Sequence, residues 1–142
     1  MSFELLDYCP KIQTLYSKKQ IDKAGKIILN KYTLQDDIYQ SYNIINSWRA
    51  SHTFYLNDVG YTLQSNNHNT MVVQRIKRLD SIIGKLKRFP NMNLSKMQDI
   101  GGCRVILSNV EQVYEAISDF KSKNTSIIFK KENDYIQNPK ST

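Results

Sequence analysis

Residues 72–106 constrain the fold of this chain most, because the pattern there changes from strand to helix and back to strand. Residues 71–78 read as a strand, along which the basic residues Arg75 and Lys77 alternate. Apolar residues then recur at helical spacing along 80–88, and Pro90 ends that helix. A second strand is predicted at 102–107. This order predicts an α+β fold in which helices pack against a sheet.

The remaining segments predict three more helices and one more strand. Apolar spacing indicates helices at about 9–32 and 34–64, with Thr33 as the N-cap of the second and Gly60 as a point where it bends or is interrupted. Ser108 and Glu111 fit a capping box that opens a further helix. A helical turn is expected at 93–98, a third strand at 126–130 and a loop at 133–142.

The charge of the chain is positive and unevenly distributed. The 142 residues carry a formal net charge of +7, and residues 72–88 contain six Lys or Arg against one acid, Asp80. A basic surface suits an anionic partner such as a nucleotide or RNA, although a solvated basic face would have the same composition.

Other features bear on the compartment. Cys9 and Cys103 show neither a disulfide framework nor metal-ligand spacing, which fits a reducing cytosol. The start lacks a signal-peptide pattern, and no apolar run reaches membrane-spanning length. We therefore expect a cytoplasmic protein without membrane contact.

The candidate binding residues lie in the strand–helix–strand stretch. Arg75 and Lys77 alternate on a strand and so share a face, while Ser81 and Lys85 share a helix face. Several cations near a helix start suit a polyphosphate. Asp99 is a candidate Mg²⁺ ligand or a turn cap. Other roles for these residues stay open. Ser81 would also fit an N-cap, and the basic residues would also fit a solvated surface. Arg104 would bind either phosphate or Asp99.

These residues carry a family resemblance. Arg-x-Lys-x-x-x-Ser-x-x-x-Lys at 75–85 and Asp-x-x-Gly-x-Arg-Val at 99–105 resemble the synthetase domain of RelA/SpoT proteins, of the small single-domain type. The stretch 134–140 is similar to that family's Asp-Tyr-Ile-x-x-Pro-Lys motif. Residues 48–52 resemble a helix of one subgroup, although Trp48, Arg49 and His52 read as packing and surface residues. The resemblance covers about 34–142, which predicts a basic N-terminal helix at 1–33 and a synthetase domain at 34–142.

The resemblance implies a pyrophosphotransferase of the stringent response. Pyrophosphate would move from ATP to the 3′-hydroxyl of GDP or GTP to make (p)ppGpp, with Mg²⁺ as cofactor. Arg75, Lys77, Ser81 and Lys85 would bind ATP, with Arg75 stacking on adenine. Asp99 would bind the metal, Arg104 would assist catalysis, and Lys140 would contact the acceptor nucleotide. The implied fold is a nucleotidyltransferase-like mixed sheet flanked by helices.

Departures from the family pattern leave other functions open. The family follows Pro-Lys with Gly-Tyr-x-Ser-x-His and later a Glu-containing strand; this sequence ends at Thr142, so we expect a C-terminally incomplete domain. Asn133 also stands where the family has a basic residue. One alternative is a toxin that pyrophosphorylates the 3′ CCA end of tRNA and has a neutralising antitoxin. Another is a catalytically dead fragment that binds a nucleotide or a partner. An unpaired edge at 126–130 predicts a homo-oligomer.

Overall fold

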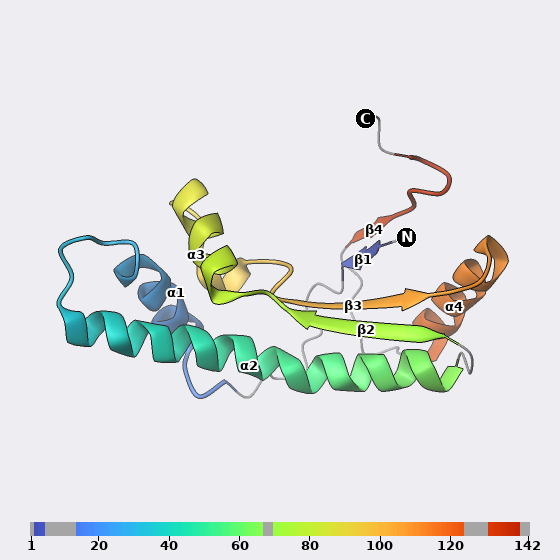
Figure 1. The fold of residues 1–142 in the computed structure, drawn as a ribbon, viewed down its shortest axis with the longest axis horizontal. Helices are drawn as coiled ribbons and strands as arrows, with labels where there is room; N and C mark the ends of the chain where they lie inside the picture. The colour runs from blue at the N-terminus through green and yellow to red at the C-terminus, as the bar shows by residue number, and fades with distance from the viewer. Residues whose placement is uncertain (1, 5–13, 67–69, 124–130, 140–142) are drawn as a thin grey trace. The chain divides into compact units, whose positions relative to one another are not determined.

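The computed structural model describes residues 2–4, 14–66, 70–123 and 131–139. Helices and short strands alternate, so the α+β class predicted from the sequence is confirmed. The elements are β1 (Ser2–Glu4), α1 (Lys18–Ile27), α2 (Gln35–Asn66), β2 (Met71–Ile76), α3 (Leu79–Arg88), the 3₁₀ turn η1 (Leu94–Lys96), β3 (Gly101–Ile106), α4 (Val110–Lys123) and β4 (Lys131–Asn133). Figure 1 labels the α-helices and the strands.

The described strands form two small sheets. β2 pairs with β3, and the two strands run in opposite directions (Figure 1). β1 pairs antiparallel with β4, with Phe3 opposite Glu132. The strands predicted at 71–78 and 102–107 are therefore present, whereas β1 and β4 were not expected. The strand predicted at 126–130 lies outside the described residues.

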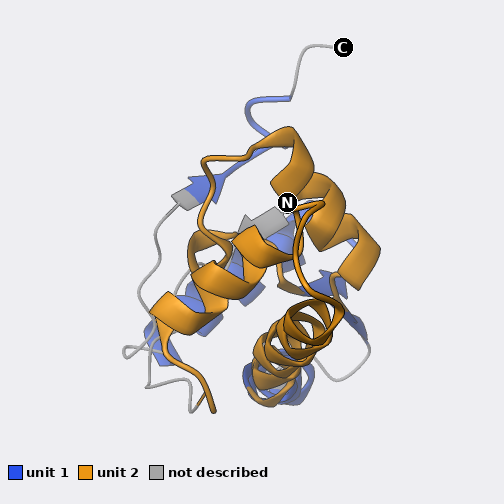
Figure 2. Ribbon diagram, turned by 90° about the vertical axis from the view of Figure 1, so that its left-hand side faces the viewer, with its two compact units in different colours: residues 1–11, 55–75, 102–142 blue, residues 12–54, 76–101 orange. Residues whose placement is uncertain are grey.

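The chain divides into two compact units, coloured separately in Figure 2. One comprises residues 1–11, 55–75 and 102–142, and the other comprises 12–54 and 76–101. We call them the 102–142 unit and the 76–101 unit. The division into 1–33 and 34–142 that the sequence suggested stays a prediction. Within the described parts of the chain, no helix has both the length and the apolar character needed to cross a bilayer.

The 76–101 unit has the larger hydrophobic core. Side chains from α1, α2, α3, η1 and the segment between η1 and β3 are buried together: Ile21, Ala24, Ile45, Trp48, Ile82, Leu86, Leu94, Met97 and Ile100. Asp22 joins α1 to η1, because its carboxylate accepts from the Ser95 N–H at 2.7 Å and from the Ser95 hydroxyl at 3.0 Å. This core holds α3 and the 93–100 segment in place.

The helix starts differ from those predicted. α1 begins at Lys18 because Ser17 and Gln20 form a capping box, so Leu15 lies before the helix and is exposed. Thr33 is not the N-cap of α2, because the helix begins two residues later at Gln35; the Thr33 hydroxyl donates to the carbonyl of Ile27. These ends depended on side-chain contacts that apolar spacing does not report.

Two further expectations about helices were wrong. α2 passes through Gly60 without interruption, and a Cβ there would lie 2.0 Å from Nε2 of Gln74, so the glycine gives room to a β2 side chain. α4 is capped by Asn109, whose Oδ1 accepts from the Gln112 N–H at 2.9 Å, and not by Ser108. The cap of α4 thus lies one residue later than the sequence suggested.

His52 packs edge-on against Trp48, with ring centroids 4.6 Å apart, and its Nδ1 lies 2.7 Å from the Trp48 carbonyl oxygen. A carbonyl can only accept, so Nδ1 carries the proton. Burial lowers the pKa of His52 below 6.5, against a smaller raising effect of this hydrogen bond. The folded state therefore favours the neutral ring.

We expect stability to fall as the pH drops through 6.5 towards the lower folded-state pKa of His52, because the unfolded chain binds the proton first. The measurement is urea unfolding at pH about 7.5 and about 5.5, followed by the fluorescence of Trp48, the only tryptophan. His52→Gln should reduce the difference between the two pH values. An equal difference in both proteins would contradict this role of His52.

Candidate anion-binding site

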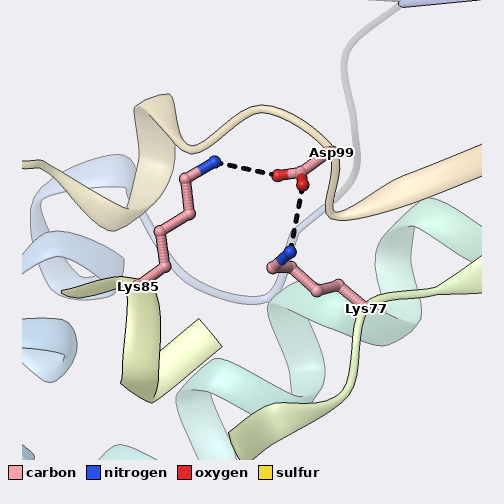
Figure 3. Close-up of polar contacts among 3 residues, drawn as sticks. All are labelled: Lys77, Lys85 and Asp99. Atoms are coloured by element: carbon pink, nitrogen blue, oxygen red, sulfur yellow. Dashed lines mark hydrogen bonds and ion pairs between the residues drawn. The ribbon is translucent and has the colours of Figure 1, made fainter. Parts of the chain in front are cut away.

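Two lysines converge on one carboxylate in the 76–101 unit. Nζ of Lys77 lies 3.0 Å from Oδ2 of Asp99, and Nζ of Lys85 lies 3.1 Å from Oδ1 (Figure 3). Each ammonium group therefore contacts a different oxygen of the Asp99 carboxylate. The lysine side chains are only 15% and 23% exposed, so solvent screens these charges less than on an open surface.

Secondary structure places each lysine. Lys77 directly follows β2, and its N–H donates to the carbonyl of Ile100 at 2.7 Å. Ile100 is buried and adjoins Asp99, so this bond brings the lysine and the carboxylate together. Lys85 lies on α3, which is fixed by the buried side chains of Ile82 and Leu86. The pair thus combines a strand end with a helix face.

Asp99 has an unusual backbone. Its φ is 65°, in the left-handed region that Asp and Asn tolerate better than most residues. Partial burial by itself would raise the pKa of its carboxyl group. Hydrogen bonds from Lys77 and Lys85 and their charges outweigh that effect, so the pKa is below its usual value. Asp99 is therefore an anion at neutral pH, and both of its oxygens are paired with lysines.

The start of α3 is open to a ligand. Its N-cap is Arg78, whose side chain makes no capping hydrogen bond, so Ser81 is not the N-cap. Ser81 is the third residue of the helix and is exposed, one turn before Lys85. Helix N-termini attract anions through free N–H groups and the helix dipole. Both features lie next to the lysine pair.

Arg75 and Arg104 belong to the 102–142 unit, on β2 and β3 respectively. Both are exposed. A Cβ on Gly102 would lie 3.4 Å from Nε of Arg75, so the glycine lies against the arginine side chain on one face of this sheet. The roles of both arginines stay predictions. Lys140 lies outside the described residues.

The Asp-Tyr-Ile stretch forms a turn in the described structure. Asp134 accepts from the N–H groups of Ile136 and Gln137 at 2.9 and 3.0 Å and from the Tyr114 hydroxyl at 2.9 Å. The Gln137 N–H, with the other two donors, lowers the pKa of Asp134, and the hydrogen bond to Asp134 raises that of Tyr114. The first residue of this motif is thus a turn residue that holds the loop on α4.

The described residues do not form a ready-made magnesium site. Asp99 is a single carboxylate whose oxygens both face ammonium groups. Among the described parts of the chain, no group of three His, Cys, Asp or Glu side chains could hold a metal ion. A hard cation needs several oxygen ligands, so Asp99 in this arrangement does not fit one.

One contact was missed by the sequence reasoning. Arg49, interpreted there as a surface or packing residue, donates from Nε to the carbonyl oxygen of Lys77 at 2.9 Å. The two residues are separated by 28 positions and lie on different elements. The only signal in the sequence was the place of Arg49 in the segment that resembles a subgroup helix, and that signal named no partner.

A family match covers the site. Residues 74–142 match the family model described as the region found in RelA / SpoT proteins. This match includes Lys77, Lys85 and Asp99, and it leaves the earlier segment 34–73 outside. No curated protein matches the chain.

Proposed function

We propose that the protein transfers pyrophosphate from ATP to the 3′-hydroxyl of GDP or GTP, because residues 74–142 match the model of the region found in RelA / SpoT proteins. The family is of the (p)ppGpp synthetase type, its substrates are nucleotides, and its members generally depend on Mg²⁺. Within this proposal, the lysine pair of the 76–101 unit binds the phosphates of ATP.

The convergence of Lys77 and Lys85 on one carboxylate carries the proposal. The two ammonium groups lie within 3.1 Å of different oxygens of one carboxylate. The same spacing suits another anion with several oxygens, such as a phosphate. The uncapped start of α3 beside them offers N–H groups to the same ligand. ATP would replace Asp99 as the partner of the lysines.

The lysines supply charge and position in this reaction. A bond forms between the acceptor 3′-oxygen and the β-phosphorus of ATP, the hydroxyl proton passes to solvent, the bond from that phosphorus to the α-phosphate oxygen breaks, and AMP leaves. Negative charge increases on the phosphate oxygens as this happens, so fixed cations favour the transition state. Partial burial of Lys77 and Lys85 strengthens that effect.

A tRNA acceptor is favoured by a separate observation. α1 buries Ile21 and Ala24 and exposes a row of lysines in the same unit as the pair: Lys18, Lys19, Lys23 and Lys26. An exposed basic helix face suits a nucleic-acid backbone. The second candidate function is therefore pyrophosphate transfer to the 3′ CCA end of tRNA.

One labelling experiment tests both functions. The protein is incubated with γ-labelled ATP, Mg²⁺ and either GDP or deacylated tRNA, and labelled products are separated. We expect label in the guanine nucleotide; label in tRNA alone would favour the second function. Lys77→Ala is expected to reduce transfer at least tenfold, the low end for loss of a charged phosphate contact.

Lys87→Ala is the matched control, because Lys87 is exposed two positions after Lys85 and so lies on nearly the opposite side of α3. It should transfer label as the unaltered protein does. Absence of transfer to both acceptors, with ATP binding intact, would overturn the enzymatic proposal and leave nucleotide binding.

A further inference from the structure

Arg49 is held at two edges of its guanidinium group. Nε donates to the Lys77 carbonyl oxygen at 2.9 Å, and Nη1 donates to Oδ1 of Asn46, one turn earlier on α2, at 2.8 Å. Arg49 is half-buried, and its neighbour Trp48 is 6% exposed in the core. The helix and the core therefore fix the place from which Nε reaches the Lys77 backbone.

The backbone of Lys77 is consequently held on both sides. Its carbonyl accepts from Arg49, and its N–H donates to Ile100 at 2.7 Å. The first bond ties the end of β2 to α2, and the second ties it to the segment that carries Asp99. Lys77 is also the point where the chain leaves β2 and turns into α3.

We propose that Arg49 is a positioning residue that fixes the Lys77 backbone so that the Lys77 ammonium group meets the anion of this site. Two of the five N–H donors of Arg49 are used on the Lys77 carbonyl and on Asn46, whereas the described ion pairs of Asp99 come from Lys77 and Lys85. The anion is Asp99 in the free protein. The identification of this anion as a polyphosphate in the working enzyme rests on the proposed function.

A physical reason makes the effect substantial. The Lys77 side chain is only 15% exposed, so its surroundings restrict the conformations of its otherwise flexible stem, and a turn of the peptide at its base would move the ammonium group. Without a donor from Arg49, the Lys77 carbonyl is free to turn at the strand end, and the peptide turns with it. Small displacements of a charged group cause large losses where a ligand must be held closely.

The first test needs no ligand. The coupling free energy between Lys77 and Asp99 is measured by a double-mutant cycle, in which the urea unfolding of Lys77→Met, Asp99→Asn and the double variant is compared with that of the unaltered protein. The cycle is measured first with Arg49 present and then again with Arg49→Met in every protein. Contacting pairs show a measurable coupling in such cycles, and we expect it to fall by roughly half or more without Arg49. A purely structural Arg49 would lower stability but leave this coupling unchanged, and that result would overturn the proposal.

Two variants keep the test decisive if Arg49→Met does not fold. Arg49→Lys keeps the charge and N–H donors but lacks the planar fork, so it should retain part of the coupling. Asn46→Ala keeps Arg49 and removes the acceptor of Nη1, so it should reduce the coupling less than Arg49→Met. Lys87→Met, which removes an exposed charge from α3, should leave the coupling as it was.

A second test separates this inference from the proposed function. The affinity of the whole chain for inorganic tripolyphosphate is measured by calorimetry with Lys77 or Met at position 77. Arg49→Met should weaken binding roughly fivefold when Lys77 is present and less than about twofold when it is absent. Equal weakening in both would overturn the positioning role. If Lys77→Met leaves the affinity for tripolyphosphate unchanged, the proposed function fails. The coupling free energy measured by urea unfolding without ligand still decides the role of Arg49.

Discussion

Lys77→Ala is expected to weaken ATP binding by about 1.5–3 kcal/mol, the range for a hydrogen bond to a charged group. The Lys77 side chain is 15% exposed and its ammonium group is held 3.0 Å from an anion in the free protein, so little has to be ordered when ATP arrives. Calorimetric titration with ATP measures the change. Arg75→Ala, at the position predicted to share the strand face with Lys77, is expected to weaken binding in the same range.

Lys87→Ala provides the comparison for the Lys77 variant, since it removes the same charge from the exposed side of α3. Its effect should stay below about 0.5 kcal/mol, as for surface substitutions in general. If Lys77→Ala and Lys87→Ala change ATP affinity equally, the effect is general electrostatics and the site is elsewhere.

Asp99→Asn is expected to strengthen the binding of metal-free ATP by roughly 1 kcal/mol, about the value of one or two partly exposed ion pairs. Asp99 neutralises Lys77 and Lys85 in the free protein, and ATP must replace it. Asparagine suits this test because it tolerates the φ of 65° at this position. Asp99→Ala would combine the same charge loss with backbone strain.

The measurement is calorimetric titration with ATP in the presence of a chelator. Unchanged or weaker binding by Asp99→Asn would show that the carboxylate does not compete for the lysines. Lys85→Met combined with Asp99→Asn is the control: with one of the two lysines absent, the gain from removing the carboxylate should shrink.

The magnesium role of Asp99 stays a prediction that the same variant tests. Asparagine keeps the shape of the side chain but lacks the negative charge that Mg²⁺ prefers. If Asp99 binds the metal in the ATP complex, the strengthening of ATP binding by Mg²⁺ should disappear in Asp99→Asn. An equal response to Mg²⁺ in both proteins would support a carboxylate whose role is only to pair with the lysines.

Local patterns in the sequence determined the elements around the site. Alternation around Lys77 and helical spacing before Pro90 predicted β2 and α3, and the turn expected at 93–98 is present as η1. These elements depend on which face of a short segment is apolar, and a sequence reports that directly. For the same reason, the sequence could name Lys77, Lys85 and Asp99 as candidates.

Tertiary structure alone decided which of these residues meet. Two lysines bind one carboxylate because a backbone bond joins Lys77 to Ile100 and because α3 is packed by Ile82 and Leu86. The sequence offered Arg104 as a partner of Asp99, whereas the carboxylate pairs with lysines. Many cations could reach one acid, and only their positions in space select among them.

The same reason explains Arg49 and the two unexpected strands. A guanidinium group that donates to a carbonyl 28 positions away leaves no pattern in either segment. β1 and β4 pair Phe3 with Glu132, and strands this short have no periodicity to recognise. Local periodicity thus determined the helices and strands beside the site, and long-range hydrogen bonds and ion pairs decided its partners.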